Sequence, residues 1–336
     1  MLKKYTPQRI KELVYKARES KLYVLLTFLG DYLYDLLNFL KYSAVFNRTK
    51  SQEHFQGSLI YYYHKIEKGL ALPTPRVGFG KEHVNYLTKL VENYSRKYEW
   101  DETSIIALNC LNSYYEFNKD NGLDLYHLYE KLNKLSSSVP PTKRIKTGGV
   151  LKISRDEVVN QTIDFKKFAN SRYSIRNFSP EKVPLKSIEE AIEISQKTPS
   201  VCNRQASRVY VYQNDNIKNE ILKYQNGNAG FGESASSILL VTSKLEYFTG
   251  PHERNQSYID GGMYAMSLIY ALHSMGIGTC PLNLALGSKI SKKLKKAANI
   301  PESETLVMMI AVGNIPDKLK VAVSHRRKAT DVMKVY

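Results

Sequence analysis

The 336-residue chain has few cysteines, a single tryptophan and only seven histidines. Cys110, Cys202 and Cys280 lie far apart in the sequence, which excludes a disulfide framework and a knuckle of closely spaced metal-binding thiols. Scattered histidines also argue against a metal centre, so we expect no metal. Free thiols are typical of a reducing compartment, and we therefore expect a cytoplasmic protein.

The sequence also lacks an apolar run of the roughly 20 residues that a membrane-spanning helix needs. Its most apolar region, residues 22–46, has an uncharged run of nine residues that ends at Asp31. The basic stretch before it has no signal-peptide core or cleavage site. We interpret region 22–46 as a buried helix. The alternative is a helix lying on a membrane surface, so that peripheral membrane contact stays open.

Acidic residues are in deficit, with 32 Asp and Glu against 49 Lys and Arg, which gives a net charge of +17. The excess is +8 over residues 1–150 (23 basic minus 15 acidic) and +9 over residues 151–336 (26 minus 17). Because the charge is spread evenly, the sequence shows no dedicated nucleic-acid arm. We expect a basic soluble surface and no nucleic-acid partner.

Residues 136–150 (SSSVPPTKRIKTGGV) combine serine, proline and glycine, and we predict a linker there. Before it, apolar residues at three- and four-residue spacing predict helices over 81–98 and 105–115, within a helical region 1–135. The segment 64–80 (HKIEKGLALPTPRVGFG) contains two prolines and three glycines, which predicts a shaped loop. That loop is either a connector between helices or a lid over a binding site.

Helices and strands alternate after the linker, in a domain covering residues 151–336. We predict helices over 184–197 and 260–275, the second of them apolar on nearly every side. Apolar β-branched and aromatic runs predict strands at 209–212, 238–241 and 305–312, with Gly313 ending the last. Strands that are apolar on both faces indicate a sheet covered by helices on both sides.

Four clusters in this second part carry chemically useful groups. Two arginines and a serine in the first can converge on a phosphate, and the fourth is another compact basic group. The hydroxyl and amide groups of the second suit the edges of a planar heterocycle. The glycines of the third allow close backbone approach to a ligand. The clusters are residues 172–178 (RYSIRNF), 198–205 (TPSVCNRQ), 276–282 (GIGTCPL) and 324–327 (SHRR).

In this order, from about residue 157 to 336, the clusters resemble the FMN-dependent nitroreductase family. The resemblance implies an α+β fold, a three-layer α/β/α sandwich, here preceded by a mostly α-helical N-terminal region. It also implies FMN as the cofactor and a homodimer that holds the flavin at the subunit interface. The family often continues Q-P-W, whereas Ala206 and Ser207 follow Gln205 here.

The resemblance also assigns roles to individual positions. Arg172 and Ser174 match the phosphate contacts, and Arg176 matches the cation near flavin N1. The late phosphate ligand is Arg326, with Ser324 and Arg327 as close candidates. The full set of expected cofactor-binding residues is Arg172, Tyr173, Ser174, Arg176, Pro199, Ser200, Asn203, Gln205, Thr279, Cys280, Pro281, Ser324, Arg326 and Arg327. Within it, Pro199, Ser200 and Asn203 match the loop that meets the partner's flavin, and Thr279–Pro281 the segment passing N5.

The activity implied is hydride transfer from a reduced donor, NAD(P)H, through flavin N5 to an unidentified small acceptor. The sequence singles out no catalytic side chain, and Cys280 is either a buried packing residue or a redox thiol. One alternative is a degenerate scaffold acting as a binding or membrane-surface assembly factor, for instance in surface polysaccharide biosynthesis. Another is an unusual flavin reaction such as flavin fragmentation.

For the N-terminal region we predict a helical layer, residues 1–135, packed on the dimer. Region 22–46 is too apolar to face water, and protein cover is the simplest remedy. The loop 64–80 is expected near the flavin, where His64 and Arg76 would bind an anionic substrate.

Overall fold

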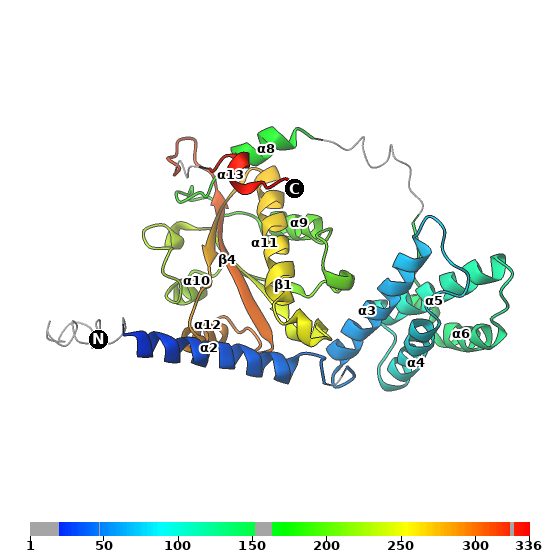
Figure 1. Ribbon diagram of the computed structural model, residues 1–336. Coiled ribbons are helices and arrows are strands. Elements are labelled where there is room, and N and C mark those ends of the chain that lie inside the picture. The colour runs from blue at the N-terminus through cyan, green and yellow to red at the C-terminus, as the bar shows by residue number, and fades with distance from the viewer. Residues whose placement is uncertain (1–19, 47, 152–162, 323–325) are drawn as a thin grey trace.

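The computed structural model describes residues 20–46, 48–151, 163–322 and 326–336. Figure 1 shows a helical bundle, formed by α3 to α6, beside a body built around a β-sheet. A long helix, α2, runs along one edge of the sheet body and leads into the bundle. The N-terminal part of the chain is therefore helical, as expected, and precedes an α/β region.

The bundle consists of α3 (Gln52–Leu70), α4 (Lys81–Lys97), α5 (Glu102–Asp120) and α6 (Tyr126–Ser138). Each helix buries one apolar stripe in a core shared by this bundle, and the predicted helices over 81–98 and 105–115 are confirmed. Asp101 starts α5 through a capping box with Ser104 and also accepts hydrogen bonds from Tyr94 and Gln56. One carboxylate thus joins three helices.

Two sequence predictions in this region were wrong in part. Residues 64–70 belong to α3, so the irregular loop covers only 71–80. Gly69 is needed inside the helix because a Cβ there would lie 2.1 Å from the Phe79 ring. Similarly, residues 136–138 of the predicted linker are the end of α6. The chain then runs back along α5, where the Asn109 side chain donates to the carbonyls of Ile145 and Thr147, both at 2.8 Å.

The sheet has four antiparallel strands in the order β1-β2-β4-β3. They are β1 (Ser207–Tyr212), β2 (Ser237–Lys244), β3 (Ile277–Asn283) and β4 (Glu304–Asn314). The three predicted strands are confirmed, but β4 continues through Gly313 to Asn314. Sequence analysis missed β3, which includes residues of the GIGTCPL cluster.

Helices cover both faces of this sheet, which confirms the three-layer α/β/α sandwich. Leu239 and Val241 of β2 point to one side, where α9 (Leu185–Ser195) and α11 (Gln256–Ser274) pack. Ile238 and Leu240 point to the other, toward α10 (Asp215–Leu222) and α12 (Ser288–Ala297). The long helix α11 lies close to the sheet at Gly261, where a Cβ would come within 2.6 Å of Val307.

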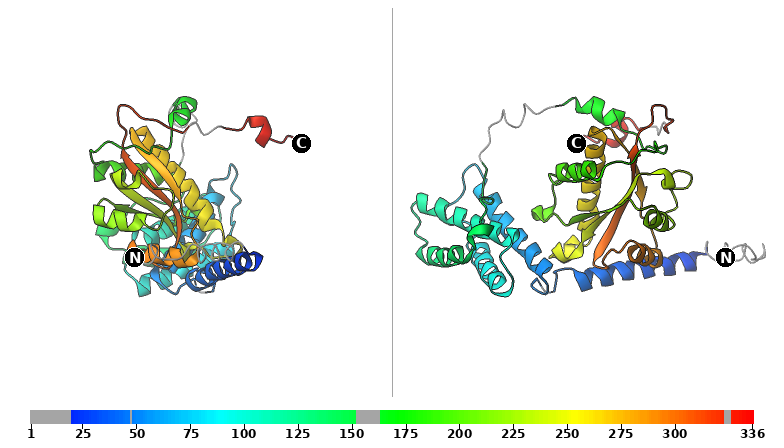
Figure 2. Two further views of the ribbon diagram at one scale, coloured as in Figure 1. Left: turned by 90° about the vertical axis from the view of Figure 1, so that its left-hand side faces the viewer. Right: turned by 180° about the vertical axis from the view of Figure 1, so that it is seen from behind.

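Helix α2 (Lys21–Tyr42) departs from the prediction that region 22–46 is covered by protein. Twelve large apolar side chains between Leu22 and Leu40 are 37–70% exposed, and Phe39 is the buried one. None of the described helices is long and apolar enough to cross a bilayer. Two further α-helices are short, α8 (Phe165–Ser171) and α13 (Ala329–Val332). Figure 2 shows α13 on a segment that extends away from the body.

Candidate functional site

Three arginines from distant parts of the sequence meet in one cavity of about 470 Å³. Arg172 and Arg176 come from the stretch after α8, and Arg326 comes from the C-terminal segment. The floor is completed by two residues of α11. The lining residues are Ala169, Asn170, Arg172, Tyr173, Ser174, Arg176, Met266, Tyr270, Ala322 and Arg326. We call this the Arg172 cavity.

The sheet fixes the arginine-bearing stretch in place. Ser174 forms a parallel bridge with Thr279 of β3, and the Ile175 amide donates to the Thr279 carbonyl at 2.8 Å. Because side chains alternate along an extended segment, Ile175 points into the core while the side chains on either side of it remain at the surface. The first and third clusters of the sequence are therefore adjacent, joined by backbone hydrogen bonds.

An aromatic cluster attaches α8 to the end of α11. The Phe168 ring lies 5.5 Å from Tyr270 and 5.0 Å from His273 between centroids. The Ser171 hydroxyl and His273 Nε2 are 2.8 Å apart, and burial lowers the pKa of His273, with Arg172 adding to the effect. This pair escaped sequence analysis, since no spacing links residues 102 positions apart.

The electrostatics of the Arg172 cavity favour an anion. Three of the described residues that line it are arginines and none of the described lining residues is acidic, so the lining is positively charged. Burial raises the pKa of the Cys280 thiol, although Arg176 and Arg172 act in the opposite direction. Cys280 is completely buried in the sheet body. Its burial and its raised pKa both favour the thiol form over the thiolate.

The second sequence cluster lies at the opposite end of α11. There the Val201 amide donates to Asp260 Oδ2 at 3.1 Å, and the Gln205 amide donates to the Ser200 hydroxyl at 3.0 Å. Asp260 and Tyr270 are ten residues apart on α11, which corresponds to about 15 Å along the helix. Within one chain, the loop 198–205 therefore does not line the Arg172 cavity.

A buried ion pair holds this loop. Arg204 is fully buried and makes two hydrogen bonds to Glu253, at 2.6 and 3.0 Å, and one to the Tyr247 carbonyl at 2.8 Å. Burial alone would raise the pKa of Glu253, but Arg204 and the amides of Thr249 and Gly250 together outweigh it and the pKa is lowered. The guanidinium also lies 5.7 Å from the centre of the Tyr61 ring of α3. The helical bundle thus contacts this loop through α3.

The residues expected to bind a cofactor lie in separate places in the structure. Arg172, Tyr173, Ser174, Arg176 and Arg326 line one cavity. Thr279, Cys280 and Pro281 lie beside it on β3, whereas Pro199, Ser200, Asn203 and Gln205 lie at the other end of α11. Arg327 is exposed and does not line the cavity, and Ser324 lies outside the described residues.

The two candidate substrate contacts do not join the Arg172 cavity. His64 lies on α3, where its Nδ1 is 3.0 Å from Glu67 Oε2, and Arg76 lies in the loop 71–80. Neither is among the residues that line the cavity.

The role expected for Gly278 also changes. Its missing Cβ leaves room for Ile315 and the Gly313 carbonyl rather than for a ligand.

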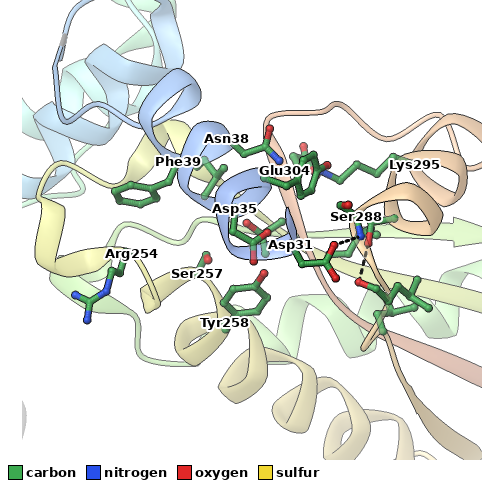
Figure 3. Close-up of a pocket in the computed structure, with 17 residues that line it drawn as sticks. Asp31, Asp35, Asn38, Phe39, Arg254, Ser257, Tyr258, Ser288, Lys295 and Glu304 are labelled. Carbon is green, nitrogen blue, oxygen red and sulfur yellow. Dashed lines mark hydrogen bonds between the residues drawn. The ribbon is translucent and has the colours of Figure 1, made fainter. Parts of the chain in front are cut away.

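A smaller cavity of about 120 Å³ lies between α2, α11, α12 and β4. Figure 3 shows Asp35 of α2 facing Tyr258 of α11, and Asp31 bonded to the start of α12. The Ser288 amide donates to Asp31 Oδ1 at 2.8 Å. Burial and the nearby Asp31 raise the pKa of Asp35, and burial lowers that of Lys295. The hydrogen bond between Asp31 and Ser288 attaches α2 to α12 at this cavity.

FMN fits the groups of the Arg172 cavity. Guanidinium groups and a serine hydroxyl suit its phosphate, and Tyr173, Met266 and Tyr270 provide flat or flexible apolar surface for its ring. The cavity volume also lies within the usual range of ligand pockets, about 300–1,000 Å³. Across the described part of the chain, no group of three His, Cys, Asp or Glu side chains is arranged to hold a metal ion.

A family model described as the nitroreductase family matches residues 169–228 and 219–314. Among solved structures, a nitroreductase family protein from Streptococcus pneumoniae is 21% identical with a TM-score of 0.45, covering 52% of this chain and 100% of that one. A nitroreductase candidate from Desulfovibrio desulfuricans in complex with FMN is 20% identical with a TM-score of 0.45, covering 52% of this chain and 98% of that one. An FMN-dependent nitroreductase from Clostridium difficile is 15% identical with a TM-score of 0.41, covering 47% of this chain and 91% of that one. A comparison with curated proteins finds no match.

Proposed function

The C-terminal part of this chain is a nitroreductase family domain preceded by a helical region, and we propose that it is an FMN-dependent oxidoreductase. The observation that carries the proposal is the meeting of Arg172, Arg176 and Arg326, from segments 150 residues apart, in one cavity without a described acidic lining residue. Bound FMN would supply hydride transfer between a reduced donor and an acceptor.

The residues of the cavity have separable tasks in this proposal. Arg172, Ser174 and Arg326 bind the phosphate through charge-assisted hydrogen bonds. Arg176 keeps a permanent positive charge in the cavity, which favours the more negatively charged form of a ligand. Cys280 does not line the cavity and packs in the core behind it. We take NAD(P)H as the donor, an unidentified small molecule as the acceptor, and the cytoplasm as the location, in keeping with three free cysteines.

We propose that the protein is a homodimer. The loop 198–205 and the Arg172 cavity lie at opposite ends of α11 and cannot form one site within a chain. A twofold pairing with the two α11 helices antiparallel brings the loop of one copy to the cavity of the other. Ile259 and Met263 of α11 are 53% and 40% exposed, which leaves apolar surface for such a pairing.

The first test is the visible absorbance of the purified protein, together with FMN titration of the apoprotein. We expect flavin absorbance bands and oxidation of NADH or NADPH by the loaded protein. Arg172→Ala and Arg326→Ala should each weaken FMN binding by about tenfold or more, since each removes charge-assisted hydrogen bonds. Arg96→Ala, an exposed arginine on α4, is the matched control and should bind FMN normally. A colourless protein that takes up no FMN would refute the proposal.

A further inference from the structure

Helix α2 presents its polar residues to the protein and its apolar residues to solvent. Asp31 and Asp35 line the small cavity beneath it, and the Tyr34 hydroxyl reaches Glu302. On the other face, Leu29, Leu33 and their apolar neighbours are more than a third exposed. A surface helix normally has the reverse arrangement. A patch of this size on a soluble protein indicates a surface that another molecule covers.

The exposed face of α2 belongs to a larger apolar side of the molecule. In the left view of Figure 2, α2, α11 and the C-terminal segment with α13 all lie toward the same side of the sheet body. Helix α11 exposes the apolar side chains of Ile259 and Met263. Val332 and Met333 at the C-terminal end are 73% and 59% exposed. One partner could therefore cover all three segments together.

The pairing of α11 helices proposed above determines which part of a second copy α2 would meet. Helix α2 packs near the start of α11, since Asp35 and Tyr258 line the same cavity. In an antiparallel pair, the start of one α11 lies opposite the end of the other. The end of α11 carries Tyr270, the contact with α8 and the Arg172 cavity.

We infer that α2 packs against a second copy of this chain, over α8 and beside that copy's Arg172 cavity. The inference rests on the proposed function, because the antiparallel pairing was deduced from the divided site. It adds a segment from outside the residues matched by the family model to the dimer interface. It also gives each cavity an apolar wall of leucines supplied by the partner.

A lipid surface is the competing occupant. Helix α12 lies beside α2 and exposes Lys289, Lys293 and Lys296, which would attract anionic lipid. A bilayer facing this side would also cover these segments, but it would not account for the division of the site between the two ends of α11. A second copy accounts for both the divided site and the exposed apolar side.

The test measures the dimer dissociation constant of the FMN-loaded full chain by sedimentation velocity over a dilution series. Leu29→Ser/Leu33→Ser should raise this constant about tenfold or more, because both side chains lose burial in the interface. Leu72→Ser/Leu151→Ser is the matched control, since these leucines are at least as exposed but lie away from α2. It should leave the constant unchanged. Circular dichroism verifies that both variants are folded.

Cross-linking tests the location directly. A bismaleimide should join Leu33→Cys of one copy to Lys166→Cys on α8 of the other and give covalent dimers. The pair Leu33→Cys with Lys131→Cys on α6 should not. An unchanged dissociation constant in Leu29→Ser/Leu33→Ser refutes the inference. So does flotation of the wild-type chain with phosphatidylcholine–phosphatidylglycerol vesicles that this variant loses while its dimer persists. A wild-type chain that binds no FMN or stays monomeric instead refutes the proposed function.

Discussion

Arginines from other segments lie near both ends of α11, and their charge is balanced differently at the two ends. At the start of the helix, Arg204 is fully buried and Glu253 neutralises it through two hydrogen bonds. At the other end, Arg172 and Arg176 line an open cavity in which no described lining residue is acidic. A buried arginine with its carboxylate fixes a loop. Arginines gathered around a cavity create a positive potential that a bound anion relieves.

The largest effect should come from removing the ion pair between Arg204 and Glu253 near the start of α11. Arg204→Ala removes the cation that pairs with Glu253 and leaves its partly buried charge with only the Thr249 and Gly250 amides, so we expect a loss of about 3 kcal/mol of unfolding free energy. Chemical denaturation measures it. Arg254→Ala, a nearby exposed arginine, should change stability by less than about 0.5 kcal/mol. Equal losses in the two variants would show that Arg204 is not the residue that holds the loop.

The same pair predicts a pH dependence with a definite sign. The pKa of Glu253 is lowered in the folded chain, so its stabilising effect is complete above the ordinary value of 4.5 and is lost as pH falls through the folded value. Glu253→Gln should therefore cost about 2 kcal/mol near neutral pH and progressively less in acid. Denaturation of both proteins across this range provides the measurement. A cost that stays constant down to strong acid would contradict the ion-pair interpretation.

A single substitution of the same shape can place a negative charge among the arginines of the Arg172 cavity. Asn170→Asp places a carboxylate in the lining of the Arg172 cavity. We expect FMN to bind about tenfold more weakly, while the apoprotein becomes no less stable because like charges are relieved. Titration by flavin fluorescence and thermal unfolding give the two readings. Asn85→Asp on α4 is the control, and tighter FMN binding in Asn170→Asp would invalidate the comparison.

The smallest effect concerns the backbone of the loop beside Arg204. Cys202 has φ +50°, a conformation that costs a β-branched residue most. Cys202→Val should lose about 1 kcal/mol of stability, whereas Cys202→Gly should be nearly neutral. Thermal unfolding distinguishes them. If both variants unfold at the wild-type temperature, the loop is not held in this conformation in solution.

Sequence reasoning located the groups that meet in the Arg172 cavity because their order along the chain matches a family pattern. It could not state that the loop 198–205 stands at the far end of α11. The separation depends on which turn of α11 accepts the Val201 amide, and the periodicity of an all-round apolar helix does not reveal that. The Ser171–His273 contact and the ion pair of Arg204 were missed for the same reason.

The errors in secondary structure have identifiable physical causes. Sequence analysis interpreted the glycines of the GIGTCPL cluster as room for a ligand and missed β3, an edge strand that tolerates these glycines and Pro281. Gly69 was counted among the glycines of a loop predicted over 64–80, but it makes room for Phe79 within α3. Region 22–46 was predicted to be covered by protein on the dimer, but twelve of its large apolar side chains are exposed in the described chain. Hydrophobicity alone does not show which face of a helix meets the rest of its own chain.

The bridge between Ser174 and Thr279 also bears on aggregation. Strand β3 forms one edge of the sheet, and an open edge is a template on which another chain can add a strand. The stretch that carries Arg172 and Arg176 lies along part of this edge and occupies the Thr279 carbonyl. A chain in which this stretch came away from β3 would expose the edge to strand addition by another molecule.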